Sequence, residues 1–198
     1  MGRHARKKAS FRRHLAAMGI LALLFLPACM GGGGGDESVS PSDNSVIPPT
    51  DGSAPDPGVA DIREEMLAAV NEARAVSRMC GSVSHGPSPS VSWSDAVAMA
   101  AYLHSSDMAL NGFFSHTGSD GSSAGQRITR QGYSWRTYGE NIGVGYPTVA
   151  SVVQGWLGSE GHCRNIMDPD FTVIGAGYAA GGYGGNPSAR YWTLDLAD

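Results

Sequence analysis

The sequence is poor in basic residues once its first 28 positions are set aside. Residues 1–28 contain six of the 14 Lys and Arg residues, which leaves eight Arg and no Lys against 18 Asp and Glu, a net charge of −10. Proteins that bind nucleic acid neutralise its phosphates with Lys and Arg. This charge balance therefore excludes nucleic acid as an expected partner.

The sequence also has no long apolar run at its N-terminus of the kind that crosses a membrane permanently. LAAMGILALLFLPA, at 15–28, has 14 residues, whereas a spanning helix needs about 20. It follows the basic stretch MGRHARKKASFRRH, and this order is typical of a secretory signal. We expect residues 1–28 to be a signal peptide, with a short membrane anchor helix as the alternative.

The apolar run ends in Leu-Pro-Ala-Cys at 26–29, which resembles the bacterial lipobox. In that motif the signal is cut before the cysteine, and the cysteine is then lipidated. The resemblance implies a lipid on Cys29, and hence a bacterial membrane lipoprotein that faces the periplasm or the exterior. A plain secretory cut nearby is the alternative.

The segment 29–59 is rich in Gly, Ser, Pro and Asp and has few large apolar side chains. Such a segment buries too little apolar surface to offset the entropy cost of ordering. We expect it to be a flexible tether. Residues 60–198 then form one domain of ordinary size.

Cysteine is scarce, and beyond Cys29 only Cys80 and Cys163 remain. Two cysteines in an exported, oxidising compartment predict one disulfide bond, here between the end of the first predicted helix and the segment after His162. Such a bond typically stabilises a protein by about 2–4 kcal/mol. The alternative is a Cys163 nucleophile activated by a histidine, although the side chain of the adjacent His162 would point away from it.

Hydrophobic periodicity within the domain predicts three full helices and a shorter one, at 61–79, 95–110, 148–158 and about 123–131 respectively. Two apolar runs, FTVIGAGYA and ARYWTLDLA, flank the turn-rich AGGYGGNPS and predict an antiparallel hairpin. A further short strand is expected after Glu140. Helices followed by an antiparallel pair predict an α+β class, with helices on one or both faces of the sheet.

Two glycine motifs lack the context that their usual functions need. VIGAGYAA contains Gly-x-Gly-x-x-Ala, and Asp195 lies 20 residues after Gly175, where a dinucleotide-binding protein places its ribose-binding acid. The stretch that should then form a helix holds four more glycines and a proline, which disfavour a helix. Gly-Ser-Ser-Ala-Gly at 121–125 matches G-x-S-x-G, but a polar loop precedes it instead of a strand, so Ser123 is not expected to be a nucleophile.

Four histidines remain beyond the signal: His85, His104, His116 and His162. We expect His85, in a Gly-Pro loop, to be solvated, and His104, on the second predicted helix, to be packed and hydrogen-bonded. His116 and His162 lie at predicted helix-to-loop transitions, where functional sites concentrate. Glu140 lies between them, and the spacing is too wide for a local metal motif such as H-E-x-x-H.

Several motifs together resemble the bacterial branch of the CAP superfamily, the SCP-like family of cysteine-rich secretory, antigen 5 and pathogenesis-related-1 proteins. They occur in order over about residues 62–198 and include FSH, YGEN and W-x-x-S-x-G-H-x-x-N-I. The resemblance implies an α-β-α sandwich in which a small antiparallel sheet is flanked by helices.

The resemblance also implies a cleft in which two histidines and two acidic residues can bind a divalent cation such as zinc. His116 takes the place of the first histidine, Glu140 of the first acid and His162 of the second histidine. Ser159 holds the usual place of the second acid, with Glu160 next to it. His116, His162 and Glu140 are thus candidate metal ligands, and an unmetallated hydrogen-bond cluster is the alternative.

Three functions are consistent with these features. The first is a lipid-anchored extracytoplasmic domain that binds a lipid, an envelope glycan, a metal ion or another protein at the cleft. The second is a metal-dependent hydrolase or peptidase with Glu140 as the candidate catalytic base. The third is a purely structural role for the cleft residues. We expect a binding protein rather than an enzyme.

Overall fold

Residues 62–198 are described by the structure, a computed structural model of the chain. The predicted signal peptide, the lipidated Cys29 and the predicted tether lie outside the described residues. The helices are α2 (Arg63–Arg74), α3 (Asp95–Asn111), α4 (Ala124–Arg130), α5 (Val149–Leu157) and α6 (Glu160–Met167). The strands are β1 (Arg78–Cys80), β2 (Val83–His85), β3 (Ser92–Trp93), β4 (Tyr138–Val144), β5 (Val173–Tyr183) and β6 (Asn186–Ala197).

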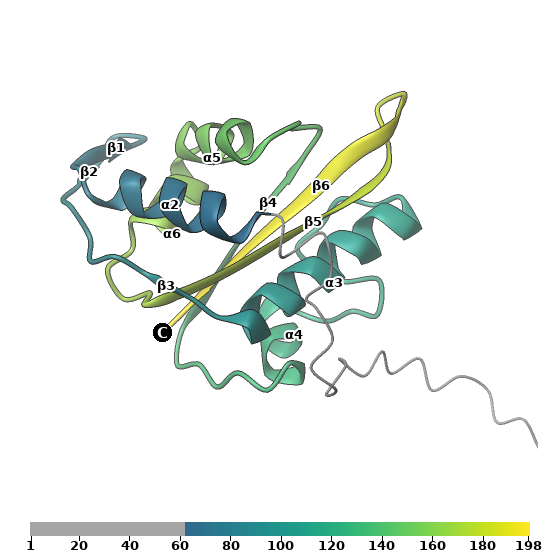
Figure 1. Cartoon of the computed structure of the whole chain (residues 1–198), viewed down its shortest axis with the longest axis horizontal. Helices are drawn as coiled ribbons and strands as arrows, with labels where there is room; N and C mark the ends of the chain where they lie inside the picture. Colours follow the sequence, from purple (N-terminus) through teal and green to yellow (C-terminus); the bar gives the residue numbers. More distant parts are fainter. Residues whose placement is uncertain (1–61) are drawn as a thin grey trace, which may run out of the picture. The chain divides into compact units, whose positions relative to one another are not determined.

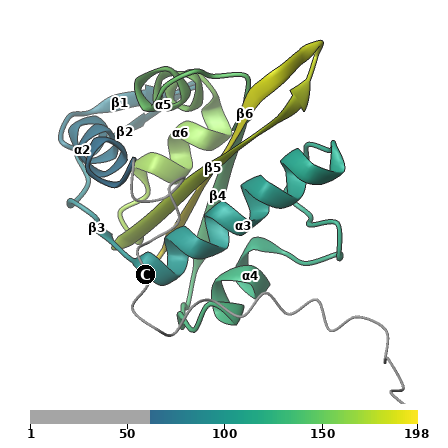
Figure 2. The same cartoon turned by 45° about the vertical axis from the view of Figure 1, so that its right-hand side comes forward.

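The main sheet has the strand order β3-β5-β6-β4. Strands β5 and β6 form a long antiparallel hairpin, β4 pairs antiparallel with β6, and the short β3 pairs parallel with β5. Helices α3 and α4 cover one face of this sheet, and α2, α5 and α6 cover the other (Figures 1 and 2). The predicted α+β class and α-β-α sandwich are both confirmed.

Helix ends follow local capping chemistry. Ser94 accepts a hydrogen bond from the Val97 amide at the start of α3, and Gly112 ends that helix in the left-handed region at φ 65°. Helices α4 and α5 both begin with capping boxes, built on Ser123 and Thr148. The three helices predicted at 95–110, 123–131 and 148–158 therefore begin and end close to their predicted limits.

The first predicted helix is too long, because α2 ends at Arg74. Residues 78–80 instead form β1, which pairs with β2. Cys80 therefore lies on a strand, not at a helix end, and its disulfide bond to Cys163 joins β1 to α6 with a Cα–Cα distance of 5.4 Å. The predicted disulfide is confirmed, and it excludes Cys163 as a free nucleophile.

Two further boundaries differ from the prediction. The predicted strand after Glu140 begins earlier, at Tyr138, and so contains Glu140. Most of the predicted linker between the hairpin strands is itself strand, since only Gly184 and Gly185 separate β5 from β6. Both glycines have positive φ, 57° and 84°, as a tight two-residue hairpin turn requires.

The glycines of VIGAGYAA allow α3 to pack closely on β5. A Cβ added to Gly177 would lie 2.6 Å from Tyr102 Cα, and one added to Gly175 would collide with the backbone of Val97 and Ala98. No helix follows β5, because the chain turns directly into β6. The motif therefore serves helix–sheet packing, and the expectation that the following residues do not form a helix is confirmed.

Candidate functional site

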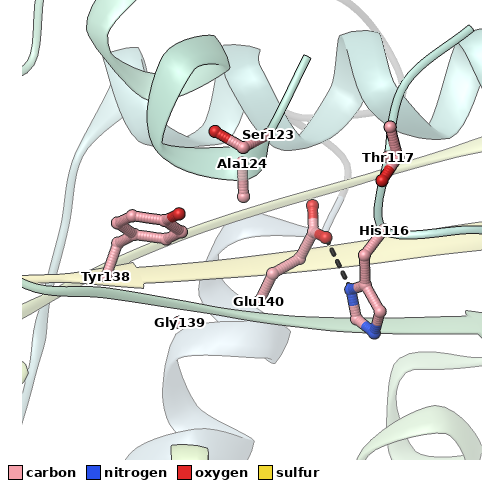
Figure 3. Close-up of a pocket in the computed structure, with 7 residues that line it drawn as sticks. All are labelled: His116, Thr117, Ser123, Ala124, Tyr138, Gly139 and Glu140. Atoms are coloured by element: carbon pink, nitrogen blue, oxygen red, sulfur yellow. Dashed lines mark hydrogen bonds and ion pairs between the residues drawn. The ribbon is translucent and has the colours of Figure 1, made fainter. Parts of the chain in front are cut away.

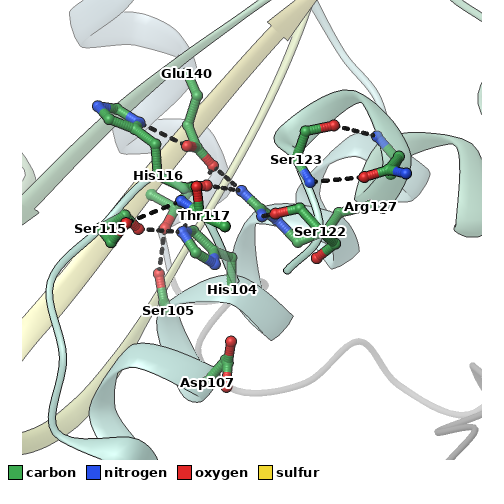
Figure 4. A network of polar contacts seen from close by, with 12 residues as sticks. His104, Ser105, Asp107, Ser115, His116, Thr117, Ser122, Ser123, Arg127 and Glu140 are labelled. Atoms are coloured by element: carbon green, nitrogen blue, oxygen red, sulfur yellow. Dashed lines mark hydrogen bonds and ion pairs between the residues drawn. The ribbon is translucent and has the colours of Figure 1, made fainter. Parts of the chain in front are cut away.

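Three segments far apart in the sequence meet at one edge of the sheet. Glu140 lies on β4, His116 lies in the loop after α3, and Arg127 lies on α4. His116 Nδ1 is 2.7 Å from Glu140 Oε1 (Figure 3). The Arg127 guanidinium donates to Glu140 Oε2 at 2.5 Å (Figure 4). Both carboxylate oxygens of Glu140 therefore already have a partner.

The Glu140 carboxylate is almost completely buried, with 4% of its side chain exposed, whereas 57% of the His116 side chain is exposed. Burial acts to raise the pKa of Glu140, but the hydrogen bond with His116 and the positive charge of Arg127 outweigh it and hold that pKa below its ordinary value. Glu140 is therefore ionised at neutral pH and is a weak base. Arg127 also donates to the carbonyls of Ser122 and His116, at 2.9 Å and 3.1 Å, which fixes the loop that carries His116.

His104 is a buried member of the same cluster. Its Nε2 lies 2.9 Å from the Ser115 carbonyl oxygen and 3.9 Å from Glu140 Oε2. Burial lowers the pKa of His104, although the Glu140 charge acts in the opposite direction. The expectation of a packed, hydrogen-bonded helix residue is confirmed, and the ring also supports the loop before His116.

Asp195 lies beside Glu140 in the interior. The two residues are directly paired across β4 and β6, so their side chains share one face of the sheet. Asp195 is fully buried, and neither of its oxygens has a hydrogen-bond partner among the described residues. Burial raises the pKa of the Asp195 carboxyl well above its usual range and the Glu140 carboxylate raises it further, while Arg127 lowers it. We infer that Asp195 is held in the protonated form.

We expect Asp195→Asn to stabilise the protein increasingly as the pH rises. Below about pH 4 this carboxyl is protonated in both the folded and the unfolded chain, so the variant gains no advantage from charge. Above that pH the unfolded wild type loses the proton while the folded state keeps it, which costs about 1.4 kcal/mol per pH unit up to the folded pKa. The amide removes this cost. The charged groups that act on this position are Glu140 on β4 and Arg127 on α4, and His104 on α3 lies 3.9 Å from Glu140.

Urea unfolding of wild type and Asp195→Asn at pH 4, 6 and 8 measures this effect. Asp170→Asn, at an exposed position in the loop before β5, is the matched control. Stability profiles that run parallel for wild type and Asp195→Asn across this range would contradict a protonated, buried Asp195.

An open pocket of about 300 Å³ lies beside this cluster. His116 and Tyr138 lie on opposite sides of it, with Glu140 between them (Figure 3). The first turn of α4 forms another wall; the full lining is His116, Thr117, Ser123, Ala124, Tyr138, Gly139 and Glu140. This volume is at the lower end of the range of small-molecule sites. The ionised cluster therefore has an accessible surface at which a ligand can contact it.

Three predicted cleft residues do not line this pocket. His162 lies inside α6, a helix that the sequence analysis did not predict, and its carbonyl accepts a hydrogen bond from Asn141. Burial and the charge of His116 lower the pKa of His162. Ser159 is the N-cap residue of α6, and Glu160 lies against Gly81 of the β1–β2 turn.

The donor set does not fit a resident divalent cation. Within residues 62–198, no group of three or more His, Cys, Asp or Glu side chains is arranged to hold a metal ion. The two oxygens of Glu140 are engaged by His116 and by Arg127, and the positive charge of Arg127 in contact with the carboxylate opposes the binding of a cation there. Ser159, at the place of the second acid, supplies no carboxylate.

Sequence reasoning missed Arg127, Asp195 and Tyr138 as parts of the site. Arg127 lies in RITRQGY, a stretch to which the sequence analysis assigns no function. From the sequence alone, Asp195 is considered only for its spacing from Gly175. The structure explains that spacing by strand pairing, because the two residues lie opposite each other on β5 and β6. A buried acid in the apolar run ARYWTLDLA was the available signal.

Comparison with known proteins agrees with this structure. A family model described as CAP, cysteine-rich secretory protein family, matches residues 67–196. The chain is 38% identical to YkwD of Bacillus subtilis (strain 168), in a match that covers 44% of this chain and 34% of that protein. It is 35% identical to the membrane protein YlbC of the same strain, in a match that covers 48% of this chain and 27% of that protein. The chain thus spans about a third or less of these curated relatives.

Two solved structures have the same fold. One is an extracellular protein containing an SCP domain from Bacillus anthracis str. Ames, with a TM-score of 0.55, 25% identity, and coverage of 70% of this chain and 41% of that one. The other is an outer surface protein from Borrelia burgdorferi, with a TM-score of 0.55, 16% identity, and coverage of 70% and 92%. The family model and the shared sandwich lead to one conclusion: this chain belongs to the CAP family of cysteine-rich secretory proteins.

Proposed function

We propose that this protein is an extracytoplasmic CAP-domain lipoprotein, anchored through Cys29, that binds a ligand in the pocket between His116 and Tyr138. The signal-like residues 1–28 support export, and a disulfide bond between Cys80 and Cys163 suits an oxidising compartment. The Bacillus anthracis protein with the same fold is described as extracellular. Within residues 62–198 no helix is both long and apolar enough to span a membrane.

The observation that carries the binding proposal is the state of Glu140. A general base needs a pKa near the working pH. The hydrogen bond with His116 and the charge of Arg127 hold the pKa of Glu140 below its ordinary value, so the ionised carboxylate is poorly suited to remove a proton from water. Each carboxylate oxygen has a second lone pair, so Glu140 can still accept a hydrogen bond from a ligand as a fixed acceptor. The geometry therefore favours binding over hydrolysis.

Binding can be separated from a purely structural role with a variant that fills the pocket without touching the buried cluster. Thr117 lines the pocket and is exposed, so Thr117→Trp should block the site and leave the melting temperature unchanged. Leu110→Trp, at a residue 85% exposed and outside the pocket lining, is the matched control.

The measurement is the NMR response of the full chain in nanodiscs to lipid, glycan and peptide fractions of a bacterial envelope extract. We expect one fraction to shift the amide signals of Gly139 and Ala124 in wild type and in Leu110→Trp, and to leave Thr117→Trp unaffected. If no fraction shifts these signals at saturating concentration, the binding proposal is wrong.

A further inference from the structure

A second cavity adjoins the pocket at the first turn of α4. Its volume is about 380 Å³, and it shares Ser123 and Tyr138 with the pocket beside Glu140. Its other walls come from α4 and from the loop that leads to β4; they are Gly125, Gln126, Thr129, Arg130 and Trp135. Because the two cavities share these residues, we take them together as one groove, with His116 and Glu140 at one end and Trp135 at the other.

Two aromatic rings form the far wall of this groove. Trp135 and Tyr138 are in edge-to-face contact, with ring centroids 4.5 Å apart and an interplanar angle of 75°. The Trp135 indole N–H donates to the Gly125 carbonyl at 3.1 Å and to the Thr129 hydroxyl at 3.0 Å. Because its one polar atom is committed to α4, the indole can offer a ligand only apolar surface.

Gly125 makes this arrangement possible. A Cβ at position 125 would lie 2.5 Å from Tyr138 Cε1 and 2.7 Å from Trp135 Cζ2, so any larger residue would push both rings away from the helix. The φ of Gly125 is not positive, so the backbone conformation does not require glycine here. The glycine is therefore explained by the position of the aromatic pair.

The charged side chains that line the groove are already paired. Arg130 donates to Asp120 at 2.6 Å, and Glu140 is held by His116 and Arg127. An anionic ligand would need an uncommitted cation, and an acyl chain would need an enclosed apolar channel, which this groove of mixed polar and apolar side chains is not. The lining suits an uncharged ligand that has both apolar faces and hydrogen-bonding edges.

We propose that this groove binds a neutral saccharide, with one sugar ring on Trp135 and Tyr138 and the next ring towards His116 and Glu140. The C–H face of a pyranose ring matches an aromatic surface, and its hydroxyls match the Glu140 carboxylate and the Thr117 and Ser123 hydroxyls at the other end. This inference rests on the proposed function, because it names the ligand class of the same pocket.

The test uses the full chain in nanodiscs and four neutral tetrasaccharides that differ in sugar, linkage and acetylation: tetra-N-acetylchitotetraose, cellotetraose, maltotetraose and mannotetraose. Binding is measured by calorimetry and by the indole N–H signal of Trp135, which Trp135→Phe assigns. We expect at least one probe to bind wild type and to shift that signal. The affinity for this probe should fall by about tenfold or more in Trp135→Leu and in Tyr138→Leu. Trp135→Phe should keep most of the affinity.

Trp93→Leu is the matched control, because Trp93 lies on β3 outside the groove lining, and it should bind the probes as wild type does. The saccharide inference is wrong if no probe moves the Trp135 signal at 10 mM, or if a sulfated tetrasaccharide or phosphatidylglycerol vesicles bind in a Trp135-dependent way instead. In that case, an envelope fraction that binds wild type but not Thr117→Trp would still support the proposal that the pocket binds a ligand. The two proposals can therefore be contradicted separately.

Discussion

A Gly175→Ala variant is expected to lose about 3 kcal/mol of folding free energy, the upper end of the usual cost of overpacking, although it adds a single methyl group. That methyl group would overlap the backbone of Val97 and Ala98 and would lie 2.6 Å from Ala98 Cα. A side chain can rotate away from such a clash, but a helix backbone cannot. The variant can fold only if α3 moves off β5, which would separate the helix that carries His104 from the sheet. Urea unfolding of the purified protein measures the loss.

Gly182→Ala, in the same strand, is the matched control. A Cβ at Gly182 has no atom within 4 Å, and its φ is not positive. Replacing this glycine should therefore change stability by less than about 1 kcal/mol. If the two variants were equally stable, the close packing of α3 on β5 would be contradicted.

Gly175 also shows why a local motif can mislead. Gly-x-Gly-x-x-Ala has the letters of a dinucleotide fingerprint, and only the poor helix propensity of the following residues argued against that function. What the glycines do could not be read from the motif, because the atoms that require them belong to α3, about 75 residues earlier in the chain. The glycines of this motif indicate where another group can approach the backbone closely, and the tertiary structure determines that this group is helix α3.

The elements that the sequence predicted well are those with local signals. Helix α3 has a serine cap and a terminal glycine, and the β5–β6 hairpin has long β-branched and aromatic runs around a Gly-rich turn. Strands β1 and β3 are only three and two residues long, too short for a periodic pattern. Helix α6 has eight residues, one of them Gly161, and it is stabilised by packing and by the Cys80–Cys163 bond more than by helix propensity.

The candidate site was predictable only in part, for the same reason. His116 and Glu140 were identified by resemblance, and the structure brings them into direct contact. Arg127 and Asp195 are 13 and 55 residues from Glu140, and their roles come from strand pairing and from the position of α4. The family motifs identify His116 and Glu140, but they do not identify the side chain that neutralises the buried charge of Glu140. That side chain is Arg127, and its position depends on how α4 packs in this chain.

Arg127→Met is expected to destabilise the protein by about 3–5 kcal/mol, because it leaves the buried Glu140 carboxylate without its cation. Methionine replaces the unbranched apolar stem of arginine but not its guanidinium, so the packing of the stem is kept while the charge and the hydrogen bonds to Glu140, Ser122 and His116 are lost. The loss should be smaller in the double variant Arg127→Met/Glu140→Gln, because no buried charge then remains unpaired. Urea unfolding at pH 7 of wild type, both single variants and the double variant gives the coupling energy.

Arg130→Met provides the control on the same helix. Arg130 and Asp120 form an ion pair of similar length, 2.6 Å, but both side chains are more than half exposed. Exposed ion pairs contribute about 0–1 kcal/mol, so this variant should be nearly as stable as wild type. A loss in Arg127→Met no larger than that in Arg130→Met would show that the Glu140 cluster does not depend on a buried charge pair. Glu140 could then not be a fixed acceptor of the proposed kind, because the hydrogen bond with His116 and the charge of Arg127 are together proposed to keep its carboxylate ionised beside Asp195.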